Sequence, residues 1–311
     1  MSEINWKESF EIVDLLDKYT QDTELINSLP IVYHYCSFQN ASSITHGFNS
    51  RCINSTFYHK RSDLFKDKTE GKEIVDLYLA ALGLYLGRYH LNNDMIFFLK
   101  NISPDDIYPC YCDISSSITG VARKKCEAYI ACFSLDGDSK YMWDKYLKGS
   151  KSGISLGYSL LNLNEVTNES MGEGYKHVIR KILYSKTEKV LFILNFLEEL
   201  LPKCADKSFV KYSINAFLNL NKFIFKKPDY ADEKEVRSII LKPDDCNTLN
   251  CDKDKRIIEF NFGQYVPVDE MFYYYKTENQ NEKSQLRQLS PHIRLNESKF
   301  NSKQTLLSIK D

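Results

Sequence analysis

The stretch AYIACFSLDGDSKYMWDKYLKGSKSGISLGY, residues Ala128–Tyr158, contains successive patterns that together indicate the fold class. Ala128–Ser134 is almost entirely apolar and rich in residues that favour β-structure, which predicts a buried strand. Ser139–Leu147 begins with a helix-capping serine and predicts a short helix, whereas Gly153–Tyr158 predicts a second strand. Asp136-Gly137-Asp138 predicts the turn that joins the first strand to the helix. Strands and helices therefore alternate over short distances.

The same two patterns recur on both sides of this stretch. Short runs of β-branched and aromatic residues predict further strands at Ile31–Cys36, Cys52–Tyr58, Val178–Tyr184, Val236–Leu241, Arg256–Phe262 and Met271–Tyr275. Helical spacing of apolar residues predicts helices at 5–28, Glu70–Tyr89, Asp94–Lys100, Thr187–Leu201 and Lys207–Phe225. The stretch Ser103–Thr119, with two prolines and a serine triplet, predicts a loop. These patterns predict an α+β fold.

No repeat of fixed period and no low-complexity linker divides the chain. We therefore expect a helical segment at residues 1–29, one α+β domain at residues 30–275 and a polar tail at residues 276–311. A helical hairpin at residues 187–225 is expected as an insertion in the domain.

Composition excludes several classes of protein. Hydrophobic residues make up 43% of the 311 residues and charged residues 27%, which excludes wholesale disorder and collagen-like repetition. Lys and Arg number 41 against 42 Asp and Glu, so bulk charge does not favour nucleic acid or membranes as partners. The nine cysteines are odd in number and scattered, which favours free thiols and a cytoplasmic location.

The usual catalytic signatures are missing from the sequence. It contains no Walker-type phosphate loop and no GxGxxG, GxSxG or HExxH motif. Its six histidines show no metal-ligand spacing, so we expect no metal site of a standard type.

Three blocks of the sequence stand out together. The first is Tyr33–Ile44 with its continuation to Glu70, and the last is Lys227–Arg237. The middle block is the most specific, because Cys-Phe-Ser, Met-Trp-x-x-Tyr and a Gly-x-x-x-Gly strand follow one another within residues 131–158. Taken in order, the three blocks resemble the bacterial domain-of-unknown-function 2971 family, and the resemblance extends over roughly residues 30–275.

A predicted strand bearing Tyr33-His34, then a short helix, then Gly47, with a late Glu, more loosely resembles ADP-ribosyltransferase-like domains. This resemblance implies a split, mixed or antiparallel sheet, NAD as the substrate, and three strand-borne positions: a His or Arg, a Tyr or Ser, and a Glu. Candidates in this chain are His34 for the first position and Glu233 or Glu235 for the last. For the middle position the candidates are Ser55 or Thr56, with Tyr141 and Tyr146 as alternates.

The chemistry of such a reaction explains these residue types. Cleavage of the nicotinamide–ribose bond passes through an oxocarbenium-like sugar, which a nearby carboxylate stabilises. Glu233 and Glu235 are two residues apart, so on a strand both carboxylates lie on one face, whereas on a loop either can turn inward. Arg237, also on that face, can neutralise the pair. An exposed strip of weak ion pairs is the alternative interpretation of these three residues.

The remaining candidates are contacts to the dinucleotide. His34 is suited to hydrogen-bond a ribose, and Arg61 or Lys60 to meet the pyrophosphate. Trp143 or Tyr146 is suited to stack on nicotinamide or adenine. A structural role for His34, and packing beneath the sheet for the two aromatic residues, are the alternatives.

The leading hypothesis is an ADP-ribosyltransferase-like enzyme or NAD glycohydrolase, acting as a toxin or antiphage defence effector on a protein or nucleic acid. A second hypothesis is a hydrolase or nuclease acting on nucleotides, in which Asp67, Glu70, Glu233 and Glu235 surround a divalent metal. A third is a non-catalytic module with the hairpin 187–225 as its partner surface.

Overall fold

The computed structural model describes residues 6–45, 56–62, 72–102, 111–114, 122–147, 149–171, 175–204, 206–243, 251–252, 257–261, 268–288 and 293–301. Within these ranges the strands are β1 (Ile31–Ser37), β2 (Thr56–Arg61), β3 (Tyr111–Ile114), β4 (Ala122–Ser134), β5 (Ser152–Ser159), β6 (Lys176–Lys181), β7 (Glu235–Pro243), β8 (Cys251–Asp252), β9 (Ile257–Asn261), β10 (Glu270–Tyr275) and β11 (Arg294–Glu297).

The helices in these ranges are α1 (Trp6–Thr20), α2 (Thr23–Asn27), α3 (Phe38–Ile44), α4 (Ile74–Arg88), α5 (Asn93–Lys100), α6 (Lys140–Tyr146), α7 (Leu160–Ser170), α8 (Lys186–Leu200), α9 (Lys207–Asn221) and α10 (Gln280–Arg287), with 3-10 turns η4 (Lys222–Ile224) and η5 (Pro228–Glu233). None of them combines the length and the apolar character needed to cross a bilayer.

Strand β4 is the centre of a single mixed sheet. Its path through the described strands runs β11-β10-β5-β1-β4-β2-β9-β8, with β7 paired to β4 and β6 paired to β7. Strand β7 pairs with β4 from Cys126 to Ser134, which occupies one edge of β4 along that length. The pairing between β10 and β11 is parallel, and the other pairings are antiparallel.

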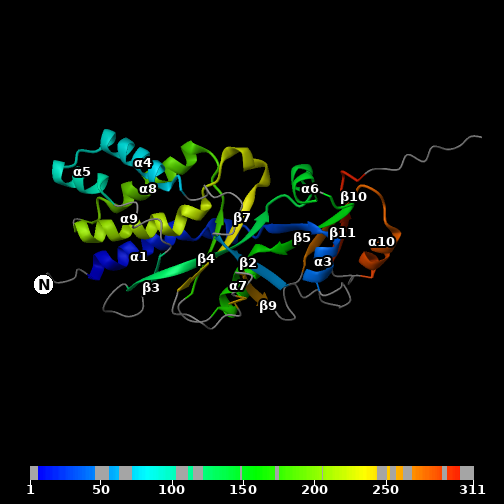
Figure 1. Ribbon diagram of the computed structural model, residues 1–311. Coiled ribbons are helices and arrows are strands. Elements are labelled where there is room, and N and C mark those ends of the chain that lie inside the picture. The colour runs from blue at the N-terminus through cyan, green and yellow to red at the C-terminus, as the bar shows by residue number, and fades with distance from the viewer. Residues whose placement is uncertain are drawn as a thin grey trace, which may run out of the picture.

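Helices cover both faces of this sheet. Helices α1, α4, α8 and α9 gather at one end of the molecule and pack on the face that carries Ala128 and Ile130 of β4 (Figure 1). At the other end of that face, α6 places Met142 and Trp143 against Tyr35 of β1. Helices α2, α3 and α7 pack on the opposite face. The two faces are therefore covered by different groups of helices.

The α+β class predicted from the sequence is confirmed, and several elements differ in detail. The predicted helix 5–28 is two helices, because Asp22 caps a new helix by accepting a hydrogen bond from the Leu25 amide. Strand β3 lies inside the stretch predicted as a loop, since its pairing with β4 outweighs weak local propensity.

The C-terminal stretch is more than a polar tail. It contains α10, whose mostly polar sequence hides its helical character, and β11, which extends the sheet beyond the boundary predicted at residue 275. Asp138, in the predicted turn, secures this stretch by accepting a hydrogen bond from the Lys299 amide (3.0 Å).

Gly153 is a position where a side chain has no room. A Cβ atom there would lie 2.9 Å from the backbone oxygen of Cys36 and would also collide with the Leu147 side chain. We expect Gly153→Ala to lower the free energy of unfolding by about 1–3 kcal/mol, because the backbone oxygen of the neighbouring strand cannot move independently. Urea denaturation measures this difference.

Gly83 provides the matched control for this prediction. It lies in α4 and a Cβ atom there would meet nothing within 4 Å. Gly83→Ala should raise the free energy of unfolding by about 0.5–1 kcal/mol, because alanine favours helix interiors. Equal effects of the two substitutions would contradict the crowding inferred at Gly153.

Candidate active site

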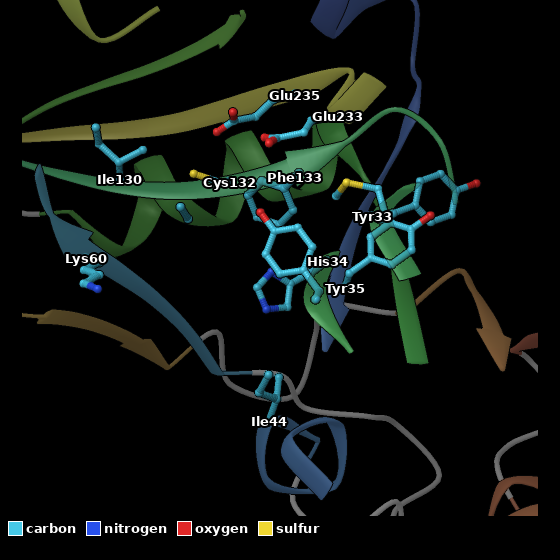
Figure 2. Close-up of a pocket in the computed structure, with 13 residues that line it drawn as sticks. Tyr33, His34, Tyr35, Ile44, Lys60, Ile130, Cys132, Phe133, Glu233 and Glu235 are labelled. Atoms are coloured by element: carbon cyan, nitrogen blue, oxygen red, sulfur yellow. The ribbon is translucent and has the colours of Figure 1, made fainter. Parts of the chain in front are cut away.

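The sheet leaves an opening beside β4. Strand β1 pairs with β4 at Ser134, and β2 pairs with it at Ile130 and Tyr129, both on the edge opposite β7. The stretch 131–133 of β4 therefore lies between these two pairings. Figure 2 shows Cys132 and Phe133 there. A cavity of about 320 Å³ lies there, lined by Tyr33, His34, Tyr35, Ile44, Lys60, Ile130, Ala131, Cys132, Phe133, Met142, Tyr146, Glu233 and Glu235.

The cavity is lined from both faces of the sheet. Tyr33 of β1 and Glu235 of β7 both pair with Ser134 of β4, and paired residues lie on the same face of a sheet. Every second residue along a strand lies on that face too, so Tyr35 and Cys132 share it with Glu235. This is the face that α6 covers. The intervening residues, which include His34 and Phe133, belong to the opposite face. The opening in the sheet brings both sets to one cavity.

The two glutamates converge on one lysine. Glu233 is the last residue of η5, and Glu235 is the first residue of β7. Lys234 between them adopts a left-handed conformation with φ of 45°. Both carboxylates accept a hydrogen bond of 2.7 Å from Lys226 Nζ. The sequence left a shared strand and a loop open for these two residues. The structure shows a 3-10 turn for Glu233, and this turn brings its carboxylate beside that of Glu235.

Two further cations complete this network. Arg237 donates from Nε to Glu235 Oε1 (2.8 Å) and from Nη1 to the Phe223 carbonyl (2.7 Å). Lys145 of α6 donates to the other oxygen of Glu233. The side chains of Glu233, Glu235 and Arg237 are at most 3% exposed. This is a buried ion-pair network, so the alternative of an exposed strip is excluded.

The network fixes the ionisation of Glu235. Burial raises the pKa of this carboxyl, but the charges of Arg237 and Lys226 outweigh burial and lower the pKa to about 2. The carboxylate is therefore ionised throughout the physiological range. Beside it, burial and the charge of Glu235 raise the pKa of the Cys132 thiol well above its ordinary value, so this thiol is protonated at neutral pH.

His34 supplies a neutral imidazole to the cavity. The side chain is partly buried, and its ring meets Phe133 edge-on with 6.2 Å between centroids. Burial lowers the pKa of His34, and a hydrogen bond with the backbone of Cys132 only partly opposes this. A neutral imidazole both donates and accepts, which suits contact with sugar hydroxyl groups.

The aromatic candidates separate into one cavity residue and one core residue. Tyr146 lines the cavity and is 45% exposed. Trp143 is fully buried, donates from Nε1 to Asp138 (2.8 Å) and stacks on Tyr274 at 5.2 Å. Trp143 therefore packs beneath the sheet, as the alternative interpretation held, and the predicted stacking on a cofactor is not supported for it.

Comparison with known proteins gives one match. Residues 142–238 match the family described as Protein of unknown function (DUF2971). The match runs from α6 to β7 and includes Tyr146, both glutamates and Arg237. The resemblance seen in the sequence is therefore confirmed over less than a third of the chain. No curated protein and no solved structure matches, so the likeness to ADP-ribosyltransferases remains a prediction.

Strands β1 and β2, with His34 and Lys60, lie outside the DUF2971 match. Ser55, Asp67 and Glu70 lie outside the described residues, as do the side chains of Thr56 and Arg61, whose backbones belong to β2. In the described part of the chain, no three His, Cys, Asp or Glu residues are grouped to hold a metal ion.

A second polar cluster lies beside the cavity. Ser238 of β7, paired with the cavity residue Ala131, is 2.8 Å from Nε2 of both His59 and His177. Nδ1 of His177 lies 3.2 Å from Oδ1 of Asn168. Burial lowers the pKa of His177 to about 3 and that of His59 well below its ordinary value.

The three histidines with lowered pKa values predict that acid destabilises the fold. His34, His59 and His177 are neutral in the folded protein, whereas in the unfolded chain they bind protons near pH 6.5. The unfolded state therefore gains protons first, and the free energy of unfolding should fall below pH 6.5 by up to about 1.4 kcal/mol per pH unit for each histidine. Urea titrations between pH 7 and 5 measure this slope.

His177→Gln should reduce the slope of the free energy of unfolding against pH by about the contribution of one histidine. His90→Gln, at an exposed position, is the matched control. Identical slopes for wild type and His177→Gln would show that His177 is not neutral in the folded protein.

Proposed function

We propose that the protein binds NAD in this cavity and breaks its nicotinamide–ribose bond, as an ADP-ribosyltransferase-like enzyme. The support is the position and charge of Glu235. Its carboxylate is ionised, buried and among the cavity-lining groups, together with the rings of Tyr35, Phe133 and Tyr146. Arg237 and Lys226 balance its charge and fix its position, so a carboxylate oxygen can contact a developing sugar cation and stabilise it at short range.

The other groups have distinct roles in this proposal. His34 hydrogen-bonds a ribose hydroxyl group, and Tyr146 stacks on the nicotinamide or adenine ring. Lys226 and Arg237 do not touch the substrate. They hold the Glu235 carboxylate in place and are positioning residues.

The reaction balances without an additional reactant beyond the acceptor. Nicotinamide leaves with the electron pair of the broken bond, and the ribose cation bonds to an oxygen or nitrogen of the acceptor. The acceptor's proton passes to solvent. A protein or nucleic acid as acceptor gives a modifying toxin or defence effector, whereas water as acceptor gives an NAD glycohydrolase. Either activity suits the NAD pool of a cytoplasm.

Nicotinamide release tests this proposal. Purified protein incubated with NAD should release nicotinamide, measured by chromatography, and NAD should raise the melting temperature. EDTA should leave the activity unchanged, because the proposed roles use no metal. The absence of both nicotinamide release and a thermal shift would contradict the proposal.

No specific observation favours either of the two alternative functions, the metal-dependent hydrolase and the non-catalytic module. The metal-dependent hydrolase needs Asp67 and Glu70, which lie outside the described residues. In the hairpin, α8 and α9 bury most of their apolar side chains in the core, and Leu191 is the one large hydrophobic residue exposed there among those described. The hairpin therefore offers no apolar stripe for a partner.

A further inference from the structure

Lys60 marks the end of the cavity opposite the glutamates. It pairs with Ile130 of β4 and lines the cavity, and its side chain is exposed. Figure 2 shows Lys60 on β2, away from Glu233 and Glu235. Glu235 pairs with Ser134, so Lys60 and Glu235 share a face of the sheet. Their pairing positions are four residues apart along β4, which corresponds to about 13 Å.

The charges around the cavity favour an anionic ligand. Glu233 and Glu235 are already neutralised by Lys145, Lys226 and Arg237, which leaves one positive charge in excess within the buried network. Lys60 adds a second positive charge at the other end. The neighbouring charges of α6 and Lys234 are paired in Lys140–Asp144 and Lys234–Asp136. Focused positive potential of this kind attracts phosphate groups.

We propose that Lys60 anchors a phosphate group, so that the cavity takes a phosphorylated ligand with its sugar at Glu235 and its phosphate at Lys60. This assignment rests on the proposed function for the identity of the sugar end. Residues 130–133 of β4 line the space between the two ends with mainly apolar side chains. A lysine ammonium binds phosphate as a point charge and needs no fixed orientation, which suits an exposed side chain at the end of the cavity.

Two nicotinamide compounds that differ by one phosphate test the anchor. Wild-type protein should bind nicotinamide mononucleotide about tenfold more tightly than nicotinamide riboside, measured by calorimetry at low salt. Lys60→Met should bring the ratio close to one by weakening the mononucleotide alone. Lys140→Met, which removes an exposed lysine of α6 outside the cavity, is the matched control and should keep the tenfold ratio.

Ribose 5-phosphate separates this inference from the proposed reaction. If it binds in a Lys60-dependent way while neither nicotinamide compound binds, the reaction is wrong and the phosphate anchor stands. Equal binding of the riboside and the mononucleotide to wild type, or an unchanged ratio in Lys60→Met, would overturn the anchor. Failure of all three compounds to bind would overturn it as well.

Discussion

Replacing Arg237 by methionine is expected to lower the free energy of unfolding by about 3–5 kcal/mol. The guanidinium is 1% exposed and bonds to Glu235 and to the Phe223 carbonyl. Its removal leaves the buried Glu235 carboxylate with Lys226 as its remaining cationic partner in the described network. The loss is large because water cannot replace the missing partner in the interior.

Urea denaturation at pH 7 measures this change, and Arg88→Met is its matched control. Arg88 forms an ion pair of similar length with Glu198 (2.8 Å), but its side chain is 54% exposed. An exposed pair of this kind contributes about 0–1 kcal/mol, so Arg88→Met should have little effect. Similar losses for the two variants would show that Arg237 is solvated and that the network is not buried.

A double variant tests whether the loss of stability in Arg237→Met comes from the unpaired charge of Glu235. Glu235→Gln with Arg237→Met removes both partners, so no buried carboxylate is left beside a missing guanidinium. We expect the free energy of unfolding of the double variant to exceed, by about 1–3 kcal/mol, the value obtained by adding the effects of the two single variants. Additive effects would indicate that the two residues stabilise the fold independently.

The central strands and helices could be predicted from the sequence because local residue patterns determine them. Ala128–Ser134, Ser139–Leu147 and Gly153–Tyr158 correspond closely to β4, α6 and β5. The N-terminal extension of β4 was missed, since Ala122–Lys125 is polar and becomes a strand by pairing with β3. Pairing with a neighbouring strand leaves no signal of its own in so short and polar a run.

The candidate site could be predicted from the sequence only in part. The family-like spacing identified His34, Tyr146, Glu233 and Glu235, which the structure places around one cavity. Lys226 was missed, because its two bonds depend on the path of η5 and on the left-handed Lys234. Lysine has no local pattern that distinguishes a buried ion pair from an exposed side chain.

Lys145 and Trp143 illustrate the same limit on one short helix. Both lie in the Met-Trp-x-x-Tyr block, yet Lys145 reaches Glu233 of η5 while Trp143 packs under the sheet. The two directions follow from the rotation of α6 against β1, which the spacing alone does not determine.

Replacing Glu235 by glutamine should lower the rate of nicotinamide release from NAD by at least about 100-fold, if the proposed reaction is correct. Glutamine keeps the shape and a carbonyl acceptor but removes the negative charge that stabilises the sugar cation. Glu233→Gln should lower the rate less. Glu233 lies in a 3-10 turn and bonds to Lys145 and Lys226, whereas strand pairing with Ser134 holds the backbone of Glu235 in place. Single-turnover rates at saturating NAD give both values.

Loss of activity in Glu235→Gln has a structural explanation that must be separated from the chemical one. The single variant leaves Arg237 buried without its carboxylate, so a distorted site would also be inactive. The double variant with Arg237→Met relieves this imbalance. If it melts close to wild type, still binds nicotinamide mononucleotide and yet releases no nicotinamide, the missing charge itself accounts for the loss. If activity returns in the double variant, Glu235 serves the fold by neutralising Arg237, and another group must stabilise the sugar cation.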